Sequence, residues 1–197
     1  MNFLSLNPEK RKKIDEYLSL LFHFKEKFNI TSFKDKEEAL RKGINPLLKI
    51  VDYVEDGKCL DIGSGSGIPA LPLSILCEKT RWILLEPSQK KAGFLIKAAI
   101  SLNLPVKVVT KNAEEYFKDT NISFSTITLR GVKITSKIAK GAHLKLNPQG
   151  KFIVFTGSEK EKEYCALLNK YNFEQRLKIE DPFATILINV PRGTKSE

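Results

Sequence analysis

A triple-glycine turn between two apolar runs is the feature that most constrains how this chain can fold. Gly63, Gly65 and Gly67 alternate with serine, and Pro69 follows shortly after them. Glycine accepts positive φ angles and lets another molecule approach the backbone closely, and proline is favoured in the first turn of a helix. This order therefore predicts a strand, a tight turn and a helix whose free N–H groups face the turn. The run reads Cys59-Leu60-Asp61-Ile62-Gly63-Ser64-Gly65-Ser66-Gly67-Ile68-Pro69.

The chain after residue 58 alternates short β-rich runs with helical stretches. Parallel strands need a crossover connection, and a helix is the usual one, so this alternation predicts a mainly parallel sheet covered on both faces. The last two strands have no room for a helix between them, which predicts an antiparallel C-terminal hairpin. Strands are expected at 59–62, 82–85, 106–110, 125–129, 152–155, 173–179 and 185–190, and helices at 69–76, 88–101, 132–144 and 159–170.

The first part of the chain has a different pattern, and residues 1–55 are expected to form a helical extension to a sheet domain of residues 56–197. Asn7 followed by Pro8 is typical of a helix start, and apolar residues then recur at three- and four-residue spacing. Gly43 stands where a left-handed residue at a helix end is expected. The second and third helices are predicted at 36–42 and 46–53.

Composition and charge bound the class of protein and its partners. The 197 residues suffice for one core, and no apolar run approaches the ~20 residues of a membrane span, so we expect neither signal peptide nor membrane anchor. The formal net charge of +10 favours a polyanionic partner, with nucleic acid first. Cys59, Cys77 and Cys165 are widely spaced and there are 2 histidines, which argues against a disulfide framework and a metal site. A cytoplasmic, reducing location is expected.

The residues around the glycine turn indicate which nucleoside it holds. Ile68 occupies the place of the last glycine of a dinucleotide fingerprint, and Asp61 beside the turn would repel a pyrophosphate. S-adenosylmethionine carries a positive sulfonium and amino group and no phosphate, so Asp61 favours this methyl donor as the cofactor. Glu86 follows the next strand, where a carboxylate can accept ribose hydroxyls. A contact to the adenine edge is expected after the third strand, in the run Asn112-Ala113-Glu114-Glu115.

Local explanations compete with each of these assignments. The glycines alone are compatible with a simple tight turn, Asp61 with a cap of that turn, and Glu86 with an exposed acid at a strand end. The acid before the turn, the strand context and the position of Glu86 together favour the ligand-binding interpretation.

On the glycine turn, Asp61 and Glu86, the chain resembles the bacterial small-subunit rRNA guanine-N7 methyltransferases of the glucose-inhibited-division type B group. The resemblance runs from about Leu20 to Gly157, and the pair Pro69 and Pro72 makes the glycine loop more specific than a bare glycine pattern. It implies a Rossmann-like class I S-adenosylmethionine-dependent methyltransferase fold. Further similar blocks are Phe28-Asn29-Ile30-Thr31, Leu84-Leu85-Glu86, Ala113-Glu114-Glu115 and Thr128-Leu129-Arg130-Gly131-Val132.

The resemblance also implies an activity, which is methyl transfer to N7 of a guanine in the decoding-region loop of 16S rRNA, position 527 in the usual numbering. It implies a 16S rRNA or small-ribosomal-subunit partner, and we expect a monomer. The chain departs from the family pattern at Lys42 and Asn45-Pro46 and at Thr156-Gly157. Carried over by position, the cofactor contacts are Gly63, Ile68, Ala113, Glu114 and Arg130, which join Asp61, Gly65, Gly67 and Glu86 in the expected site.

Guanine N7 carries an available lone pair and loses no proton when it attacks, so this chemistry needs no general base and we assign no catalytic residue. The segment after the fourth strand agrees with this, because it has neither the Asn/Asp-Pro-Pro-aromatic box of amine methylation nor a cysteine that attacks a pyrimidine ring. For Arg130, in the same segment, three roles stay open: a contact to the cofactor, orientation of guanine, or binding of phosphate.

Basic residues are concentrated in residues 120–158, where no acidic residue occurs. Lys133, Lys137 and Lys140 have four- and three-residue spacing in the helix predicted at 132–144, so they are expected to share one helix face. This pattern predicts a track for RNA phosphates, with a solvated lysine face as the alternative. The expected RNA-binding residues are Lys90, Lys91, Lys133, Lys137 and Lys140.

Three other functions remain open at this point. A small-molecule methyltransferase would share the donor site but would show little dependence on ionic strength. A donor-binding RNA-binding protein that has lost turnover would be compatible with the altered segment 42–46. A nicotinamide oxidoreductase is disfavoured because the last fingerprint glycine is absent.

Overall fold

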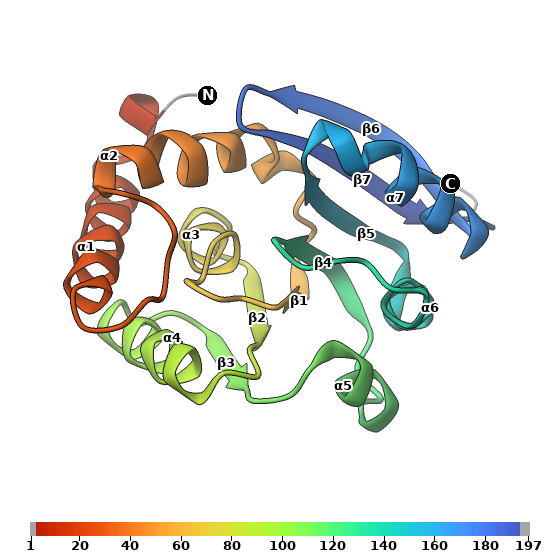
Figure 1. Ribbon diagram of the computed structural model, residues 1–197, viewed down its shortest axis with the longest axis horizontal. Helices are drawn as coiled ribbons and strands as arrows, with labels where there is room; N and C mark the ends of the chain where they lie inside the picture. Colours follow the sequence, from red (N-terminus) through yellow and green to blue (C-terminus); the bar gives the residue numbers. More distant parts are fainter. Residues whose placement is uncertain (1–2, 194–197) are drawn as a thin grey trace.

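The computed structural model describes residues 3–193, which form one sheet with helices on both faces (Figure 1). The strands are β1 (Gly57–Ile62), β2 (Thr80–Leu85), β3 (Val106–Val109), β4 (Phe124–Arg130), β5 (Leu146–Thr156), β6 (Phe173–Asp181) and β7 (Ala184–Pro191). They form a 7-stranded sheet in the order β3-β2-β1-β4-β5-β7-β6. Neighbours are parallel except where β7 pairs with β5 and β6, which confirms the predicted parallel sheet with an antiparallel C-terminal hairpin.

Successive side chains of the inner strands enter two separate cores, one on each face of the sheet. Cys59 and Leu84 belong to one core, whereas their neighbours Leu60 and Leu85 belong to the other, as the two-residue period of a strand requires. Figure 1 shows how the helices divide between the two sides. The first core is covered by α1 (Pro8–Lys25), α3 (Ala70–Leu76) and α4 (Gln89–Ser101), and the second by α5 (Ala113–Asp119), α6 (Ser136–Lys145) and α7 (Ser158–Lys170).

A short 3₁₀ helix (Phe3–Ser5) and two longer helical stretches precede β1. The first of the longer stretches is α1, whose start is confirmed because the Asn7 side chain accepts the N–H of Glu9 at 2.8 Å. The second begins as α2 (Lys36–Glu38), continues as a π-helix over Ala39–Ile44, and ends in 3₁₀ turns over Asn45–Lys49 and Val51–Tyr53. Across residues 3–193, no helix has both the length and the apolar character to cross a membrane.

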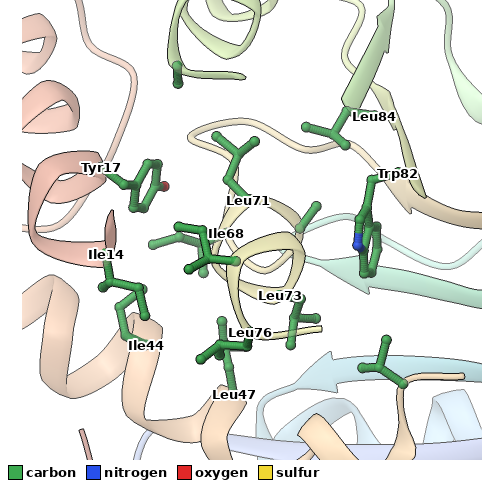
Figure 2. Packing of buried hydrophobic residues seen from close by; sticks show 14 of the residues in the cluster. Ile14, Tyr17, Ile44, Leu47, Ile68, Leu71, Leu73, Leu76, Trp82 and Leu84 are labelled. Atoms are coloured by element: carbon green, nitrogen blue, oxygen red, sulfur yellow. The ribbon is translucent and has the colours of Figure 1, made fainter. Parts of the chain in front are cut away.

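The N-terminal helices and α3 share one core (Figure 2). Ile14 and Tyr17 of α1 and Ile44 of the π-helix are fully buried, and they lie around the glycine turn and α3. Leu71 and Leu73 of α3 are fully buried in the same core. The helical stretches therefore share a core with the sheet, and the boundary after residue 55 stays a prediction.

One predicted helix begins later than expected, which corrects the lysine pattern. Helix α6 starts at Ser136 and not at residue 132, because the Thr135 hydroxyl caps it by accepting the N–H of Ile138 at 3.1 Å. Lys133 therefore lies in the loop before the helix. Lys137 and Lys140 share a helix face, but Lys133 does not share it with them.

Two further details differ from the sequence-based expectation. Helix α5 was not predicted, although Asn112 caps it by accepting the N–H of Glu115 at 2.9 Å. Gly43 is not a left-handed helix end, because it lies inside the π-helix and does not have a positive φ. It is a glycine because of close packing, since a Cβ there would come within 3.0 Å of Ile68 and 3.2 Å of Phe33.

The contact between α5 and α6 depends on Gly141, where a Cβ would overlap the ring of Phe117. We expect Gly141→Ala to lower the free energy of unfolding by about 1–3 kcal/mol, because the added methyl group must displace a buried ring. Gly93→Ala in α4 is the matched control, since a Cβ there meets nothing within 4 Å, and it should be neutral or stabilising by up to about 1 kcal/mol. Chemical denaturation measures the free energy of unfolding of both variants. Equal values for Gly141→Ala and Gly93→Ala would contradict a tight α5–α6 contact.

Candidate active site at the carboxyl edge of the sheet

The loops that follow β1, β2 and β4 surround a cavity of about 620 Å³ at the carboxyl edge of the sheet. Strand β1 lies between β2 and β4, so the connections from neighbouring strands diverge here and leave a crevice. The lining comes from four segments of the chain. They are residues 29–33, residues 63–66 with 68, residues 86–87 with 91, and residues 130–132.

The three glycines of the loop have positive φ, at +69° for Gly63, +55° for Gly65 and +95° for Gly67. A Cβ at Gly63 would overlap Val132, and a Cβ at Gly67 would overlap Leu71, so these two glycines allow close packing of the loop. A Cβ at Gly65 would meet only the carbonyl oxygen of Gly63, at 3.8 Å. Because Gly65 also lines the cavity, it is the point where a ligand can approach the backbone.

Two side chains fix the glycine loop in place. Glu86 accepts the N–H of Gly65 through Oε2 at 2.8 Å and the N–H of Ser88 through Oε1 at 2.9 Å. The Tyr17 hydroxyl donates to the carbonyl oxygen of Ser66 at 2.7 Å. Glu86 is only 6% exposed, so the alternative of an exposed strand-end acid is wrong. Each of its oxygens keeps a second lone pair that can accept a ligand hydroxyl.

Asp61 is a buried carboxylate with unused hydrogen-bonding capacity. It is 1% exposed; its Oδ1 accepts the Thr128 hydroxyl at 2.6 Å, and its Oδ2 has no hydrogen-bond partner among the described residues. The pKa of Asp61 is raised to about 6, because the effect of burial, with a smaller contribution from the charge of Glu86, exceeds the lowering by the hydrogen bond from Thr128. A positive group bound nearby would stabilise the ionised form. The hydrogen bond from Thr128 joins the carboxylate to β4, and the Ser64 hydroxyl of the turn donates to the main-chain carbonyl oxygen of Asp61 at 3.4 Å.

Arg130, at the end of β4, joins the helical segment to the sheet. Its guanidinium donates to the carbonyl oxygens of Lys42 at 2.8 Å and Gly43 at 3.2 Å. It also lies over the rings of Phe155, at 5.5 Å from the centroid, and Phe33, at 6.0 Å. Sequence reasoning missed this structural role because the two carbonyls are 88 and 87 positions away along the chain.

The connection between α1 and α2 forms a wall of the cavity that sequence reasoning did not assign. Residues 29–33 line it, and the Lys25 ammonium holds their far end by donating to the carbonyl oxygens of Phe33 and of Lys34, the latter at 2.9 Å. The sequence does carry a signal for this wall: the block Phe28-Asn29-Ile30-Thr31 is part of the family resemblance, although the resemblance does not assign it to the site.

The structure brings only part of the predicted cofactor set into the cavity lining. Gly63, Gly65, Ile68, Glu86 and Arg130 line it, and Asp61, Gly67, Ala113 and Glu114 do not. Ala113 is buried, and Glu114 accepts the Thr135 hydroxyl at 3.1 Å and pairs with Lys137 at 3.2 Å. A cofactor contact by Ala113 or Glu114 stays a prediction.

The predicted RNA-binding lysines are partly neutralised. Lys137 pairs with Glu114, whereas Lys90, Lys133 and Lys140 are exposed and make no ion pair within the described residues. Lys91 lines the cavity. Residues 3–193 contain no group of three or more His, Cys, Asp or Glu side chains arranged to hold a metal ion.

The raised pKa of Asp61 predicts a pH-dependent stability. Its folded-state pKa of about 6 lies above the ordinary 3.8, so Asp61 stabilises the fold fully below pH about 4 and this contribution is lost as the pH rises to about 6. Asp61→Asn carries no charge, so between pH 4 and 8 it should gain up to about 3 kcal/mol of stability relative to wild type. Denaturation at a series of pH values measures this gain. The exposed Asp15→Asn is the control, and a difference for Asp61→Asn that does not vary with pH would contradict the prediction.

The open space at Gly65 predicts that a large side chain there blocks ligand binding. We expect Gly65→Arg to abolish binding of S-adenosylmethionine, measured by calorimetry, because the side chain would occupy the cavity. Gly193→Arg is the control, since Gly193 also has a positive φ, at +91°, and open space, but lies outside the cavity lining. Unchanged affinity for S-adenosylmethionine in Gly65→Arg would show that the glycine loop is not part of the binding site.

Comparison with known proteins identifies the family. Residues 10–185 match the family described as rRNA small subunit methyltransferase G. The ribosomal RNA small subunit methyltransferase G of Brachyspira hyodysenteriae is 31% identical over 195 residues, which cover 95% of this chain and 94% of that protein. The protein of the same name from Nitrosococcus oceani is 31% identical over 165 residues, which cover 83% of this chain and 76% of that protein.

Solved structures share the fold at low sequence identity. A ribosomal protein L11 methylase from Lactobacillus delbrueckii subsp. bulgaricus has a TM-score of 0.63 at 18% identity, covering 73% of this chain and 75% of that one. The T. thermophilus 16S rRNA N2 G1207 methyltransferase, solved with AdoMet and guanosine, has a TM-score of 0.60 at 16% identity, covering 95% of this chain and 44% of that one. These structures support the predicted Rossmann-like methyltransferase fold. The family match over residues 10–185 and the relatives at 31% identity lead to one conclusion: the chain belongs to the rRNA small subunit methyltransferase G family.

Proposed function

We propose that this protein transfers the methyl group of S-adenosylmethionine to N7 of a guanine in the decoding-region loop of 16S rRNA. The single observation that carries the proposal is the cavity in which Gly65 leaves room at the backbone beside the buried carboxylate of Glu86, with Asp61 beneath. The family relationship supports the substrate class, because the similar proteins are named as small-subunit rRNA methyltransferases.

The residues present fit a cationic nucleoside. Glu86 keeps lone pairs for the ribose hydroxyls, and the free Oδ2 of Asp61 provides negative charge near the site. Both carboxylates would disfavour a phosphate in the same place, which favours a donor without phosphate over a dinucleotide. The open backbone at Gly65 allows the adenosine part to come into direct contact with the loop.

The chemistry requires positioning more than proton transfer. S-adenosylmethionine supplies an activated methyl group: N7 forms the new C–N bond as the C–S bond breaks, and the electron pair of that bond stays on sulfur. No proton leaves guanine N7, so no side chain has to act as a base. The titratable side chains that line the cavity are Glu86, Lys91 and Arg130, and their proposed task is to bind and orient. Residues 29–33 form one wall of the cavity, and their proposed task is to exclude water on that side.

The positive charge outside the cavity suits an RNA partner. Lys90, Lys133 and Lys140 are exposed near elements that leave the same edge of the sheet, and Lys91 lies at the cavity itself. We assign these residues, with Lys137, to contacts with RNA phosphates, where each neutralised phosphate makes binding more sensitive to salt. The proposal includes a cytoplasmic location and a monomeric protein acting on 16S rRNA or the small ribosomal subunit.

Replacement of the acceptor atom tests the proposal. We expect wild-type protein and labelled donor to modify one guanine of 16S rRNA, and substitution of that nucleotide by 7-deazaguanosine to abolish the label, because N7 is replaced by a carbon without a lone pair. Mapping of the labelled base gives the position, and a titration of salt gives the ionic-strength dependence of RNA binding. Labelling that survives the 7-deaza substitution, or that appears only on a small molecule, would contradict the proposal.

A further inference from the structure

A second cavity, of about 290 Å³, lies next to the donor cavity at the carboxyl edge of the sheet. Three segments form it: the end of β4, the end of β5 with the start of α7, and the turn between β6 and β7. Arg130, Gly131 and Val132 line both cavities, so the two spaces meet at the end of β4. A molecule in the second cavity therefore lies beside any ligand of the first.

Aromatic rings form two walls of the second cavity. Phe155 is 4% exposed and lies beneath the Arg130 guanidinium, whereas Phe183, in the β6–β7 turn, is 38% exposed. The Phe183 ring is held by the Arg41 guanidinium, at 4.9 Å from its centroid. A half-exposed ring fixed at a cavity wall offers a flat apolar surface for a planar ligand.

The β6–β7 turn is itself anchored to the N-terminal helices. Lys49 pairs with Asp181 at 2.8 Å, and the Asp181 side chain accepts the N–H of Phe183 at 3.1 Å. The wall that carries Phe183 is thus held by the same helical segment that bonds to Arg130. Lys133 and Lys160, which line the cavity, add positive charge at its edge.

Glu159 provides a carboxylate in this cavity. It lies in the first turn of α7, and a Cβ at Gly157 would overlap both of its carboxylate oxygens, so its side chain folds back over the end of β5. Among residues 3–193, no side chain or main-chain group forms a hydrogen bond or ion pair with this carboxylate. Its two oxygens are therefore available to a pair of adjacent donors on a ligand.

We propose that the second cavity receives the acceptor guanine, with the Glu159 carboxylate accepting its N1–H and exocyclic amine and Phe183 lying against the ring. This assignment rests on the proposed function. Guanine is the only standard base with two adjacent donors on its pairing edge, so a carboxylate selects it over adenine, cytosine and uracil. N7 lies at the opposite end of the base from the exocyclic amine. With the amine held at Glu159, N7 therefore faces Arg130 and the donor cavity. The positive charges at the edge suit the flanking phosphates.

The experiment compares guanosine and inosine at the target position, because inosine keeps N7 but lacks the exocyclic amine. For wild type, we expect inosine to lower kcat/KM about 10- to 100-fold. Glu159→Ala should lower kcat/KM on guanosine by a similar factor and should lose most of the discrimination, with inosine less than about threefold worse. Binding of S-adenosylmethionine, measured by calorimetry, should stay unchanged.

Glu163→Ala is the matched control, because Glu163 is an exposed glutamate of the same helix that does not line the cavity. It should keep both the activity and the preference of wild type. Equal rates on guanosine and inosine in wild type, or a full preference for guanosine in Glu159→Ala, would overturn the role of Glu159 while leaving the proposed function intact. A wild-type protein that binds the donor and methylates no guanosine RNA would overturn the proposed function, and the acceptor assignment with it.

Discussion

The hydrogen bonds from the Arg130 guanidinium to the main-chain carbonyls of Lys42 and Gly43 fix the helical segment against the carboxyl end of the sheet. Gly43 permits this approach, because a Cβ there would come within 3.0 Å of Ile68. A guanidinium that is largely buried needs such partners, since an unsatisfied buried donor costs about 1–3 kcal/mol. Arg130 also lines both cavities, so the placement of the helical segment determines the shape of the spaces proposed for the donor and for guanine.

The charges of the molecule are separated between surface and interior. The chain as a whole carries a formal net charge of +10, but Glu86, which lines the proposed donor cavity, and Asp61, at the end of the adjoining strand β1, are acidic residues only 6% and 1% exposed. Glu86 is stabilised by two backbone N–H groups, whereas the Oδ2 of Asp61 has no partner among the described residues. The ionised Asp61 therefore reduces the stability of the unliganded protein, and a cationic ligand would recover that loss. In the proposed function, the positive surface attracts RNA and the buried carboxylates attract the cationic donor.

The elements that depend on local sequence were predicted well. The seven strands, the antiparallel hairpin, the start of α1 at Asn7 and the positive φ of the glycine loop follow from short-range patterns, and the structure confirms them. The predicted start of α6 at Val132 is wrong. Val132 fits the apolar pattern of the helix that follows, but the helix begins only after the Thr135 cap. That difference places Lys133 in a loop and removes it from the lysine face.

The sequence by itself determined the alternation of strands and helices and the turn that exposes Gly65, because backbone preferences act between residues that are close along the chain. Only the tertiary structure decided which distant groups meet: Tyr17 with Ser66, Arg130 with Lys42, residues 29–33 with the glycine loop, and the β6–β7 turn with the N-terminal helices. These contacts join positions far apart in sequence, and they form because burial of the shared apolar core brings the elements together, which no local pattern encodes.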